Sequence, residues 1–544
     1  MPALLPIWAF EYPLPSYSQG ACPPALFSRT LSSRKIKKQS AIELPKTSIL
    51  PLYGIACIAV IVCGIFLRIE NAQARILHSD EAVQAYQLWE LMETGEYRYD
   101  PEDKHGPLLY YFASALNKGL GIESAELGRV SLRLLPILAS VGLMIFLLTL
   151  LREASLTTML GGAFVALSPL PVIYGAYFVQ EALFVLIGFF LLYSYFTFWN
   201  GQTVVRAAIV GLWTGVFFVT KETAIINIAA IALTVFIAFP PGRRLESWQK
   251  AARLPNLAAG LGSFVLIWGL FYSSGFKDFS QLGDSFKAFI NYAERSQGAG
   301  HEKPFFYYLS IMWPHTAEGV RWGESLFLLL SFAGLIVTFV DRRSLDPRLQ
   351  LGIFYGFLCL LLYTTIPYKT PWLALSSYAS LALAAGLAIR FLYGRYSNGW
   401  IRVIVIGVSL YCLFGQYELT KLASRYAADA RNPYIYQHTS PQFQKLVDRI
   451  ADLEALDPEG QLTIAVGGDD NAWPLPWYLR DNDTVGYWMD PRQTPPLDVV
   501  LGPAGELPPT LSATHTPEYH GLRENVLLEC WIKNELWDAF METR

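Results

Sequence analysis

The sequence contains few charged residues. Only 16% of its 544 residues are Asp, Glu, Lys or Arg, against about 25% in an average soluble protein. The charges nearly cancel, with 42 basic and 45 acidic residues, which argues against a nucleic-acid-binding protein. Hydrophobic residues make up 53% of the chain, which excludes disorder. Because a single soluble core stops growing at about 250–300 residues, the composition predicts a polytopic membrane protein with an attached soluble part.

Cysteine is also scarce and shows no pairing pattern. The six cysteines form no Cys-x-x-Cys pair, and four of them lie in apolar runs. This distribution argues against a disulfide framework and against a zinc site. The chain also has no His-Glu-x-x-His motif and no calcium-loop spacing. The pattern therefore predicts no cofactor, and a divalent metal is left open.

The first 48 residues contain no apolar run long enough to cross a membrane. Pro13, Pro15, Pro23 and Pro24 and a basic cluster at residues 34–38 occur there, and no basic segment precedes a short apolar stretch. We therefore expect no cleaved signal peptide and interpret residues 1–48 as a cytoplasmic tail. The run 49–67 has about the 20 residues that a helix needs to cross a bilayer, and we interpret it as an uncleaved first span.

Further apolar runs predict a transmembrane domain over residues 49–415 with about eleven helices. The stretch 205–239 is too long for one span and short for two, so we expect it to turn at Lys221-Glu222. The expected spans after the first are 130–151, 157–177, 181–199, 206–220, 223–239, 256–273, 324–340, 350–366, 372–390 and 401–415.

Basic residues in short loops orient the predicted bundle, because such loops stay cytoplasmic. With the N-terminus inside, the short outer connections carry mainly Lys221 and Lys369. The inner loops carry Arg152, Arg206, Arg243, Arg244, Lys250, Arg253, Arg342, Arg343, Arg348, Arg390, Arg395 and Arg402. The long loops 68–129 and 274–323 then face outward. Each holds an apolar run too short to span, and we expect these runs, 107–118 and 305–313, to lie as helices along the membrane surface.

The tail, residues 416–544, has a different pattern. Apolar residues recur at helical spacing over 443–456, and short apolar runs at 462–466, 497–501 and 526–531 are typical of strands. An odd number of spans leaves this tail outside. We therefore predict a small extracytoplasmic α/β domain.

Charged side chains near membrane spans are costly, so their positions are informative. Each one taken alone is most simply a solvated loop residue. Together they come from seven separate stretches and gather on the predicted outer face. They are His78, Asp80, Glu81, His105, Glu181, Lys221, Glu222, His301, Lys303, His315 and Lys369.

Asp80 has two interpretations of equal weight. Residues 81–93 have helical spacing and end before Gly95, so Asp80 could simply cap that helix and Glu81 could favour its dipole. Alternatively, a carboxylate where the loop leaves the bilayer could accept the proton of an attacking hydroxyl.

The other charged residues allow structural or functional roles. His105 fits a turn or a substrate contact, and Glu181 fits a structural bridge with a lysine or a second carboxylate of the site. Lys221 and Glu222 could satisfy each other. Lys221 and Lys369 could instead stabilise a leaving phosphate.

Several aromatic and histidine side chains are more simply interpreted as structural residues. We expect the aromatics to belong to an interfacial belt rather than to stack on a sugar ring. We expect the histidines to be loop residues rather than metal ligands. These residues are Tyr307, Tyr308, Trp313 and Trp372, and His301 and His315.

The ordered motifs resemble membrane glycosyltransferases of the C superfamily, which include the dolichyl-phosphate-mannose–protein mannosyltransferases. They are most similar to the branch called flippase activity-associated protein, over roughly residues 49–490. The motifs are His78-Ser79-Asp80-Glu81-Ala82, Glu93-Thr94-Gly95-Glu96-Tyr97, Tyr99-Asp100-Pro101, His105-Gly106-Pro107-Leu108, Gln180-Glu181, Lys221-Glu222-Thr223, His301-Glu302-Lys303-Pro304, Tyr307-Tyr308-Leu309, Ile366-Pro367-Tyr368-Lys369-Thr370-Pro371-Trp372, Asn432-Pro433-Tyr434 and Trp473-Pro474-Leu475-Pro476-Trp477-Tyr478-Leu479-Arg480.

The resemblance implies a many-helix bundle with a catalytic acid in the first outer loop. It also implies a polyprenyl-phosphate-linked sugar donor that enters from the membrane, and inverting transfer on the outer face. On the matching positions, Asp80 would be the base and Glu81 would support it. A lysine near the phosphate is our own inference from charge.

We therefore predict an integral glycosyltransferase of the cell membrane that transfers a sugar to a glycan, lipid or protein acceptor. Membrane lipid is an expected partner and nucleic acid is not. The predicted catalytic residues are Asp80 and Glu81. The predicted substrate-binding residues are His105, Glu181, Lys221, Glu222, His301, Lys369 and Trp372.

Two other functions stay open. A flippase-associated or transporter component would carry no bond chemistry of its own. Transporters, however, usually show internal repeats and polar groups near the midplane, whereas the polar residues here gather at one face. A non-catalytic scaffold would use the outer α/β domain to bind partner proteins.

Overall fold

A computed structural model describes residues 50–102, 105–151, 155–238, 246, 248–295, 301–456, 462–468 and 473–544. The expected cytoplasmic tail, residues 1–48, lies outside the described residues. Most described residues are helical, and one small mixed sheet lies near the C-terminus. The predicted fold class, a helical membrane bundle with a small C-terminal α/β domain, is confirmed.

Seven helices in the described part of the chain are long and apolar enough to cross a membrane. Four shorter apolar helices occupy the positions of other expected spans, while the exact number of crossings stays a prediction. The long helices are α1 (Leu50–Ala74), α4 (Arg129–Thr149), α7 (Glu181–Trp199), α11 (Leu254–Tyr272), α15 (Pro347–Thr365), α16 (Leu375–Arg395, preceded by the 3-10 turn η3, Pro371–Ala374) and α17 (Gly399–Arg425). The shorter ones are α5 (Leu156–Leu167), α8 (Val204–Phe218), α9 (Ala224–Ala238) and α14 (Ser325–Val340).

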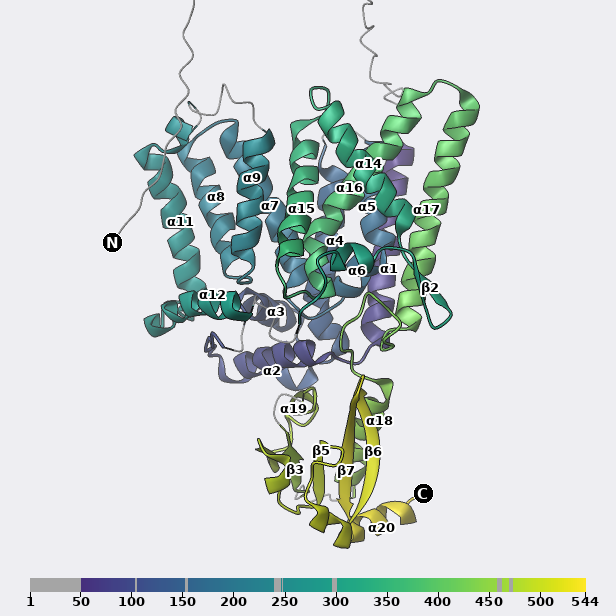
Figure 1. Ribbon diagram of the computed structural model, residues 1–544. Helices are drawn as coiled ribbons and strands as arrows, with labels where there is room; N and C mark the ends of the chain where they lie inside the picture. Colours follow the sequence, from purple (N-terminus) through teal and green to yellow (C-terminus); the bar gives the residue numbers. More distant parts are fainter. Residues whose placement is uncertain are drawn as a thin grey trace, which may run out of the picture. The chain divides into compact units, whose positions relative to one another are not determined.

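Helix α16 is the centre of the bundle and packs against α5, α14 and α15 (Figure 1). Its first fifteen residues, Leu375–Ile389, are all buried and consist mostly of Ala, Ser, Leu and Gly. Small residues let helix backbones approach closely where no hydrophobic effect drives association. At Gly334 of α14, an added Cβ would lie 1.8 Å from the carbonyl oxygen of Ala384, so this crossing requires glycine.

The expected span 157–177 is interrupted. Helix α5 ends at Leu167, and a separate short helix, α6 (Pro169–Tyr174), follows Ser168. Pro169 and Pro171 explain the break, because proline lacks an N–H and restricts the preceding residue.

Arg68 of α1 and Arg75, which directly follows α1, bind the carbonyl groups around this break. The fully buried Arg68 donates to the carbonyls of Val165 (3.0 Å) and Pro171 (3.1 Å) and to Ser140 Oγ (2.8 Å). Arg75 donates to the carbonyls of Ile173 (3.1 Å) and Ala176 (3.0 Å). The arginines therefore hold the irregular backbone inside the bundle, where no solvent could satisfy it.

Replacing Arg68 by methionine should lower the free energy of unfolding by about 3 kcal/mol, because several buried acceptors lose their donors at once. Unfolding of the detergent-solubilised protein by SDS, followed by circular dichroism, measures the change. Arg395→Met, at an exposed position near the end of α16, is the matched control and should change stability little. Equal stability of the two variants would contradict the bracing role of Arg68.

Three amphipathic helices run across the ends of the long helices at one end of the bundle (Figure 1). They are α2 (Ser79–Thr94), α3 (Leu108–Gly119) and α12 (Asp284–Arg295). The predicted helices at 81–93 and 107–118 are confirmed, and α12 was not anticipated. The prediction of a helix over 305–313 is wrong, because only one helical turn forms there, α13 (Tyr307–Ser310). A short hairpin of β1 (His315–Ala317) and β2 (Val320–Trp322) follows it. Prolines flank this run, and Tyr308, Ile311 and Met312 turn into the core instead of onto a membrane surface.

The C-terminal α/β domain contains a five-stranded sheet in the order β4-β3-β5-β7-β6. The pairs β3–β4 and β3–β5 are parallel, and β5–β7 and β6–β7 are antiparallel. The apolar face of α18 packs on the sheet, as the helical spacing of 443–456 predicts. The elements are α18 (Pro441–Glu454), β3 (Ile464–Gly467), α19 (Leu475–Tyr478), β4 (Val485–Trp488), β5 (Val499–Pro503), β6 (His515–Arg523), β7 (Val526–Lys533) and α20 (Asn534–Glu542). Helix α17 continues to Arg425, past the expected domain boundary at 415.

This domain contacts the first loop of the bundle. Thr439 donates its hydroxyl to the carbonyl of Leu77 (2.8 Å), Arg129 donates to Gln444, and Trp473 meets Tyr86 of α2 edge to face at 6.0 Å. The helix that begins with Ser79-Asp80 is therefore in contact with both the bundle and the C-terminal domain.

Candidate functional site

The start of α2 fixes the position of Asp80. His78 is the N-cap residue: its Nδ1 accepts the Asp80 N–H (3.0 Å), and the Glu81 carboxylate accepts the His78 N–H (3.2 Å), which forms a capping box. His78 Nε2 lies 3.0 Å from the carbonyl of Tyr436. Because Nδ1 accepts a hydrogen bond, the ring proton lies on Nε2 and the ring is neutral.

Asp80 does not cap the helix, so that interpretation is wrong. Its side chain is 48% exposed, and among the described residues the one titratable side chain at ion-pair distance is that of His78, with 3.7 Å between Asp80 Oδ1 and His78 Nδ1. That contact is not an ion pair, because the ring is neutral. Among the described residues, no group donates a hydrogen bond to the Asp80 carboxylate, which leaves it able to accept a proton.

Glu81 has the opposite environment. It is fully buried and bonded to Arg133 through both oxygens, with Oε1 2.7 Å from Nε and Oε2 2.6 Å from Nη2, and Phe178 N–H donates to Oε1 at 2.9 Å. Burial alone would raise the pKa of Glu81, but the charge and hydrogen bonds of Arg133 outweigh it and hold this pKa below its usual range. Glu81 is therefore a buried anion tied to the bundle.

Arg133 was missed by the sequence analysis. Besides Glu81, it binds the carbonyls of Ala72 (2.7 Å), Arg75 (2.9 Å) and Ile76 (3.3 Å) at the end of α1. It therefore joins the end of the first span to the start of α2. Its signal in the sequence is a single arginine inside the apolar run 130–151, where a charge is costly unless it has a partner.

Two short segments far apart in sequence pair with each other near Asp80. The carbonyl of His301 accepts from Lys369 N–H (3.2 Å), and the carbonyl of Pro367 accepts from Lys303 N–H (3.2 Å). An antiparallel bridge joins Glu302 to Tyr368 between them. The structure thus brings together the predicted residues His301 and Lys369, which are 68 positions apart in the sequence.

His301 and Lys369 differ in their partners. His301 Nδ1 lies 2.7 Å from the hydroxyl of Tyr436. Burial lowers the pKa of His301, and the nearby negative charge of Asp80 opposes that effect. Lys369 donates to the carbonyls of Ile366 and Lys303, and burial lowers its pKa. In the described part of the chain, no carboxylate lies within ion-pair distance of Lys369, so its charge is available to an anion.

Asp80, His301, Lys369 and Tyr436 make up one group of residues, which we call the Asp80 group. Four other predicted residues, His105, Glu181, Lys221 and Glu222, form a second group. Lys221 pairs with Glu181, and His105 Nδ1 lies 2.9 Å from Glu222 Oε2. The bridge expected of Glu181 is confirmed, whereas the idea that Lys221 and Glu222 satisfy each other is wrong. Burial would raise the pKa of Glu222, but His105 and its hydrogen bond hold it below the usual range.

The two groups adjoin each other through α2 and the segment before α7. Gln84 of α2 accepts from Gln180 Nε2 at 3.0 Å, next to Glu181. The turn between α8 and α9 carries Lys221 and Glu222, as predicted.

Trp372 does not belong to an interfacial belt, because its residue is only 9% exposed. Its ring meets His78 (6.1 Å), Tyr174 (5.7 Å) and Tyr436 (6.1 Å) edge to face. It therefore packs the rings beside Asp80. Tyr308 is also buried, whereas Trp313 is exposed and could lie in an interface.

An apolar groove of 540 Å³ lies next to this region. Its lining residues are Phe306, Leu309, Ser310, Ile311, Trp313, His315 and Pro433. His315 bonds the Trp313 carbonyl (2.9 Å) and is not part of the Asp80 group. Pro433 precedes the segment that contributes Tyr436, so the groove and the polar group share one stretch of backbone.

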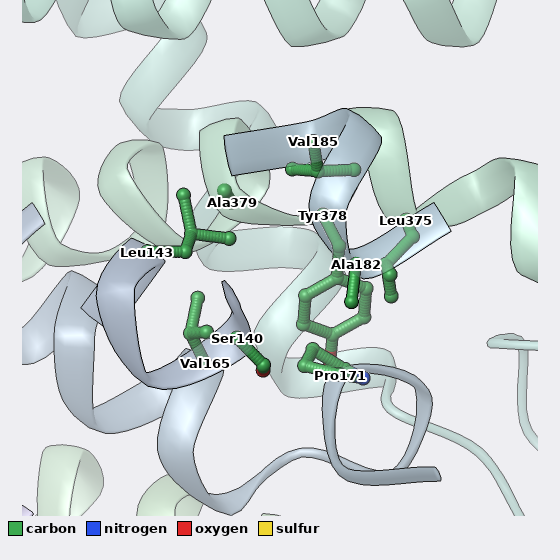
Figure 2. Close-up of a pocket in the computed structure, with 9 residues that line it drawn as sticks. All are labelled: Ser140, Leu143, Val165, Pro171, Ala182, Val185, Leu375, Tyr378 and Ala379. Atoms are coloured by element: carbon green, nitrogen blue, oxygen red, sulfur yellow. The ribbon is translucent and has the colours of Figure 1, made fainter. Parts of the chain in front are cut away.

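A second, enclosed space lies in the helix core and is too small for a substrate. Figure 2 shows Tyr378, Leu375 and Ala182 on one side of it and Ser140, Leu143 and Val165 on the other. Its volume of 10 Å³ is near the lower limit for a single water, and its walls are apolar. This space is a packing defect.

Among the described residues, no three His, Cys, Asp or Glu side chains gather as ligands to one metal ion. Two of the four site carboxylates, Glu81 and Glu181, are paired with Arg133 and Lys221, and Glu222 is bound by His105.

Comparisons with known proteins agree with this fold. Residues 104–271 match the model of the dolichyl-phosphate-mannose-protein mannosyltransferase family. No curated protein matches the chain.

Solved membrane proteins share the fold at low sequence identity. The archaeal oligosaccharyltransferase AglB from Archaeoglobus fulgidus, in complex with an inhibitory peptide and a dolichol-phosphate, is 13% identical with a TM-score of 0.54, over 84% of this chain and 70% of AglB. ArnT from Cupriavidus metallidurans, bound to undecaprenyl phosphate, is also 13% identical with a TM-score of 0.54, over 89% of this chain and 98% of ArnT. The expected fold of C-type membrane glycosyltransferases is thereby confirmed.

Proposed function

We propose that this integral membrane protein is a glycosyltransferase that moves a sugar from a polyprenyl-phosphate donor to an acceptor, with inversion. One observation carries the proposal: the exposed, donor-free carboxylate of Asp80 lies near His301 and Tyr436, next to an apolar groove. Lys369 adjoins this group because its backbone pairs with that of His301. This arrangement combines a proton acceptor, a cation and an apolar surface, which are the three things that such a donor and its transfer require. The match to the mannosyltransferase family model agrees with it.

The proposed reaction is a single displacement. An acceptor oxygen attacks the anomeric carbon while the bond from that carbon to the phosphate oxygen breaks. The electron pair leaves with the polyprenyl phosphate, and the acceptor proton passes to Asp80. Attack from the side opposite the phosphate inverts the anomeric carbon.

Lys369 is the residue we assign to the leaving phosphate. It is a point charge with no carboxylate partner in the described chain, and it lies beside His301. A fixed cation in a site with little water stabilises developing negative charge more than the same cation in water. Lys221 is less suited, because Glu181 already neutralises it.

The other site residues have supporting roles in this proposal. Glu81 positions Asp80 through Arg133, and His301 and Trp372 line the sugar side of the site. The Glu181–Lys221 and His105–Glu222 pairs form the adjoining wall. We also propose that this face lies outside the cytoplasm, as the arginine-rich opposite loops suggest.

The apolar groove is the proposed site for the first isoprene units of the donor. It is open, carries almost no polar surface, and adjoins the segment that contributes Tyr436. AglB and ArnT were solved with dolichol-phosphate and undecaprenyl phosphate, respectively, so lipids of this class bind in proteins with this fold.

Replacing Ser310 by tryptophan should raise KM for the lipid-linked donor about tenfold, because the new ring fills the groove. Ser310 is exposed, and its hydroxyl donates to the Tyr307 carbonyl of its own turn, so folding should not change. Ser310→Ala removes the hydroxyl without filling the groove, and it should behave as the unmodified protein. An unchanged KM in Ser310→Trp would place the lipid elsewhere.

The direct test of the function is a transfer assay with the purified full-length chain. The protein is reconstituted in vesicles with radiolabelled polyprenyl-phosphate hexose donors and glycan, lipid and peptide acceptors. We expect loss of label from the donor and its appearance in one acceptor class. Movement of the intact donor across the vesicle membrane without transfer would instead support a flippase.

A further inference from the structure

The segment between α17 and α18 reaches into the site. Tyr434 accepts from Tyr174 through its carbonyl (2.8 Å), and His438 Nε2 lies 2.7 Å from the Tyr177 hydroxyl. Both tyrosines belong to the interrupted helix region beside Trp372. The segment is therefore bound to the bundle on both sides of Tyr436.

Tyr436 contacts two elements near Asp80, the start of α2 and the segment that contains His301. Its carbonyl accepts from His78 Nε2 (3.0 Å), and its hydroxyl lies 2.7 Å from His301 Nδ1. Its ring meets Trp372 at 6.1 Å, and the Lys303 ammonium lies 5.3 Å from the ring centre, within cation–π range. One residue thus links the N-cap of α2 with the paired segments at 301–303 and 367–369.

The backbone next to Tyr436 is strained. Gln437 has φ of 46°, a left-handed conformation that is unfavourable for a residue with a Cβ. Its side chain is exposed and makes only a long contact of 3.4 Å, from Nε2 to the Tyr436 hydroxyl. This conformation lets the two flanking side chains, Tyr436 and His438, both point into the bundle. Such strain persists where the surroundings hold the residue in place, and it clusters at functional sites.

We propose that Tyr436 is a positioning residue, whose hydroxyl donates to His301 Nδ1 and whose carbonyl holds His78, so that His301 and Asp80 face each other across the site. This inference rests on the proposed function for its catalytic consequence and on the contacts of Tyr436 with His78 and His301 for its geometry.

The direction of the hydrogen bond follows from the two partners. Burial raises the pKa of Tyr436 and lowers that of His301, so the phenol keeps its proton and the imidazole is neutral. A neutral imidazole with Nδ1 as acceptor carries its proton on Nε2. Tyr436 therefore stabilises the neutral form of His301.

Other groups around His301 do not replace this hydrogen bond. Asp80 on α2 favours the protonated ring, Lys303 on the same segment disfavours it, and Glu302 favours it. The Tyr368 ring lies 4.8 Å away on the paired segment and carries no formal charge. Loss of the Tyr436 hydroxyl should therefore raise the pKa of His301.

The test is the variant Tyr436→Phe, which removes the hydroxyl and keeps the ring and the carbonyl. Histidine NMR titration of the full-length protein in detergent is practicable because the chain has only 7 histidines, and His301→Gln assigns the signal. We expect the His301 titration to move to higher pH. We also expect kcat to fall about 10- to 100-fold with donor KM little changed, because a small displacement at the reacting groups is costly.

Tyr411→Phe is the matched control. This tyrosine lies on α17 and is 72% exposed, so its hydroxyl should affect neither the His301 titration nor transfer. Thermal unfolding of both variants checks that they fold.

The outcomes separate the two levels of the proposal. An unchanged His301 titration in Tyr436→Phe overturns the hydrogen bond, whatever the activity. A shifted titration with transfer at the native rate overturns the positioning role. A shifted titration in a protein whose unmodified form never transfers sugar leaves the contact correct and overturns the proposed function alone.

Discussion

Asparagine in place of Asp80 should reduce sugar transfer by about 100- to 10,000-fold, the usual contribution of a general base. The amide keeps the size of the side chain but cannot take the acceptor's proton at neutral pH. Because Asp80 is half-exposed and makes no hydrogen bond to the described residues through its carboxylate, the change should leave stability unaltered. The measurement is single-turnover transfer from labelled donor, with donor binding assayed separately.

Glu90→Gln is the matched control for Asp80→Asn. Glu90 lies on the same helix, α2, but is exposed to solvent away from the site. This variant should transfer sugar normally. If Asp80→Asn, correctly inserted and stable, also transfers at the native rate, Asp80 is not the base.

The second large effect is a loss of stability when the buried ion pair of Glu81 and Arg133, next to Asp80, is broken. Replacing either Glu81 by glutamine or Arg133 by methionine should lower the free energy of unfolding by about 3–5 kcal/mol, because a buried charge is left without its partner. Transfer should fall as well, since the start of α2 loses its attachment to α1. SDS titration followed by circular dichroism measures the stability of each variant.

The pH dependence of this pair has a definite sign. The pKa of Glu81 is lower in the folded protein than its usual value, which is about 4.3 in an unfolded chain. Its contribution is therefore complete above that unfolded value and is lost as the pH falls through the lower folded value. The contribution of this pair to stability should therefore not change with small pH changes near neutrality.

The half-exposed pair Asp346–Arg348 serves as the control for Glu81–Arg133. Its shortest contact is 2.7 Å, similar to that of the buried pair, yet Asp346→Asn should cost only about 0–1 kcal/mol because water replaces the lost partner. In addition, the double variant Glu81→Gln/Arg133→Met should be more stable than Arg133→Met alone. If Asp346→Asn lowered the free energy of unfolding as much as Glu81→Gln does, burial would not be the reason for the large loss at the Glu81–Arg133 pair.

The bundle was predictable because length and hydropathy alone define a membrane-spanning helix. The hairpin at Lys221-Glu222 and the helices of the first loop followed from the same patterns. Strands β4 and β6 were missed for a physical reason: both lie at sheet edges, where strict alternation is not required, and β6 contains Pro517, which an edge strand tolerates. The break at Ser168 was also missed, although Pro169 and Pro171 signal it.

The gathering of the site residues was predictable, but their partners were not. The order of the spans decides which loops lie on the same face. Which side chains then bond to each other depends on how helices and loops far apart in sequence pack together. Arg133 pairs with a residue 52 positions earlier, and Tyr436 meets His301 across 135 positions. Sequence spacing carries no information at such separations. A lone arginine inside an apolar run is the one signal that could have revealed Arg133.

The single arginine of α1, Arg68, also imposes an order on biogenesis. Arg68 emerges from the ribosome 97 residues before Val165 and 103 residues before Pro171, whose carbonyls it binds. Until α5 and α6 enter the membrane, the guanidinium has no such acceptors and is costly in lipid. We therefore expect α1 to remain beside the insertion machinery, or with Arg68 drawn toward the membrane surface, until α5 and α6, in the third expected span, arrive. Final burial of Arg68 is a late event in assembly.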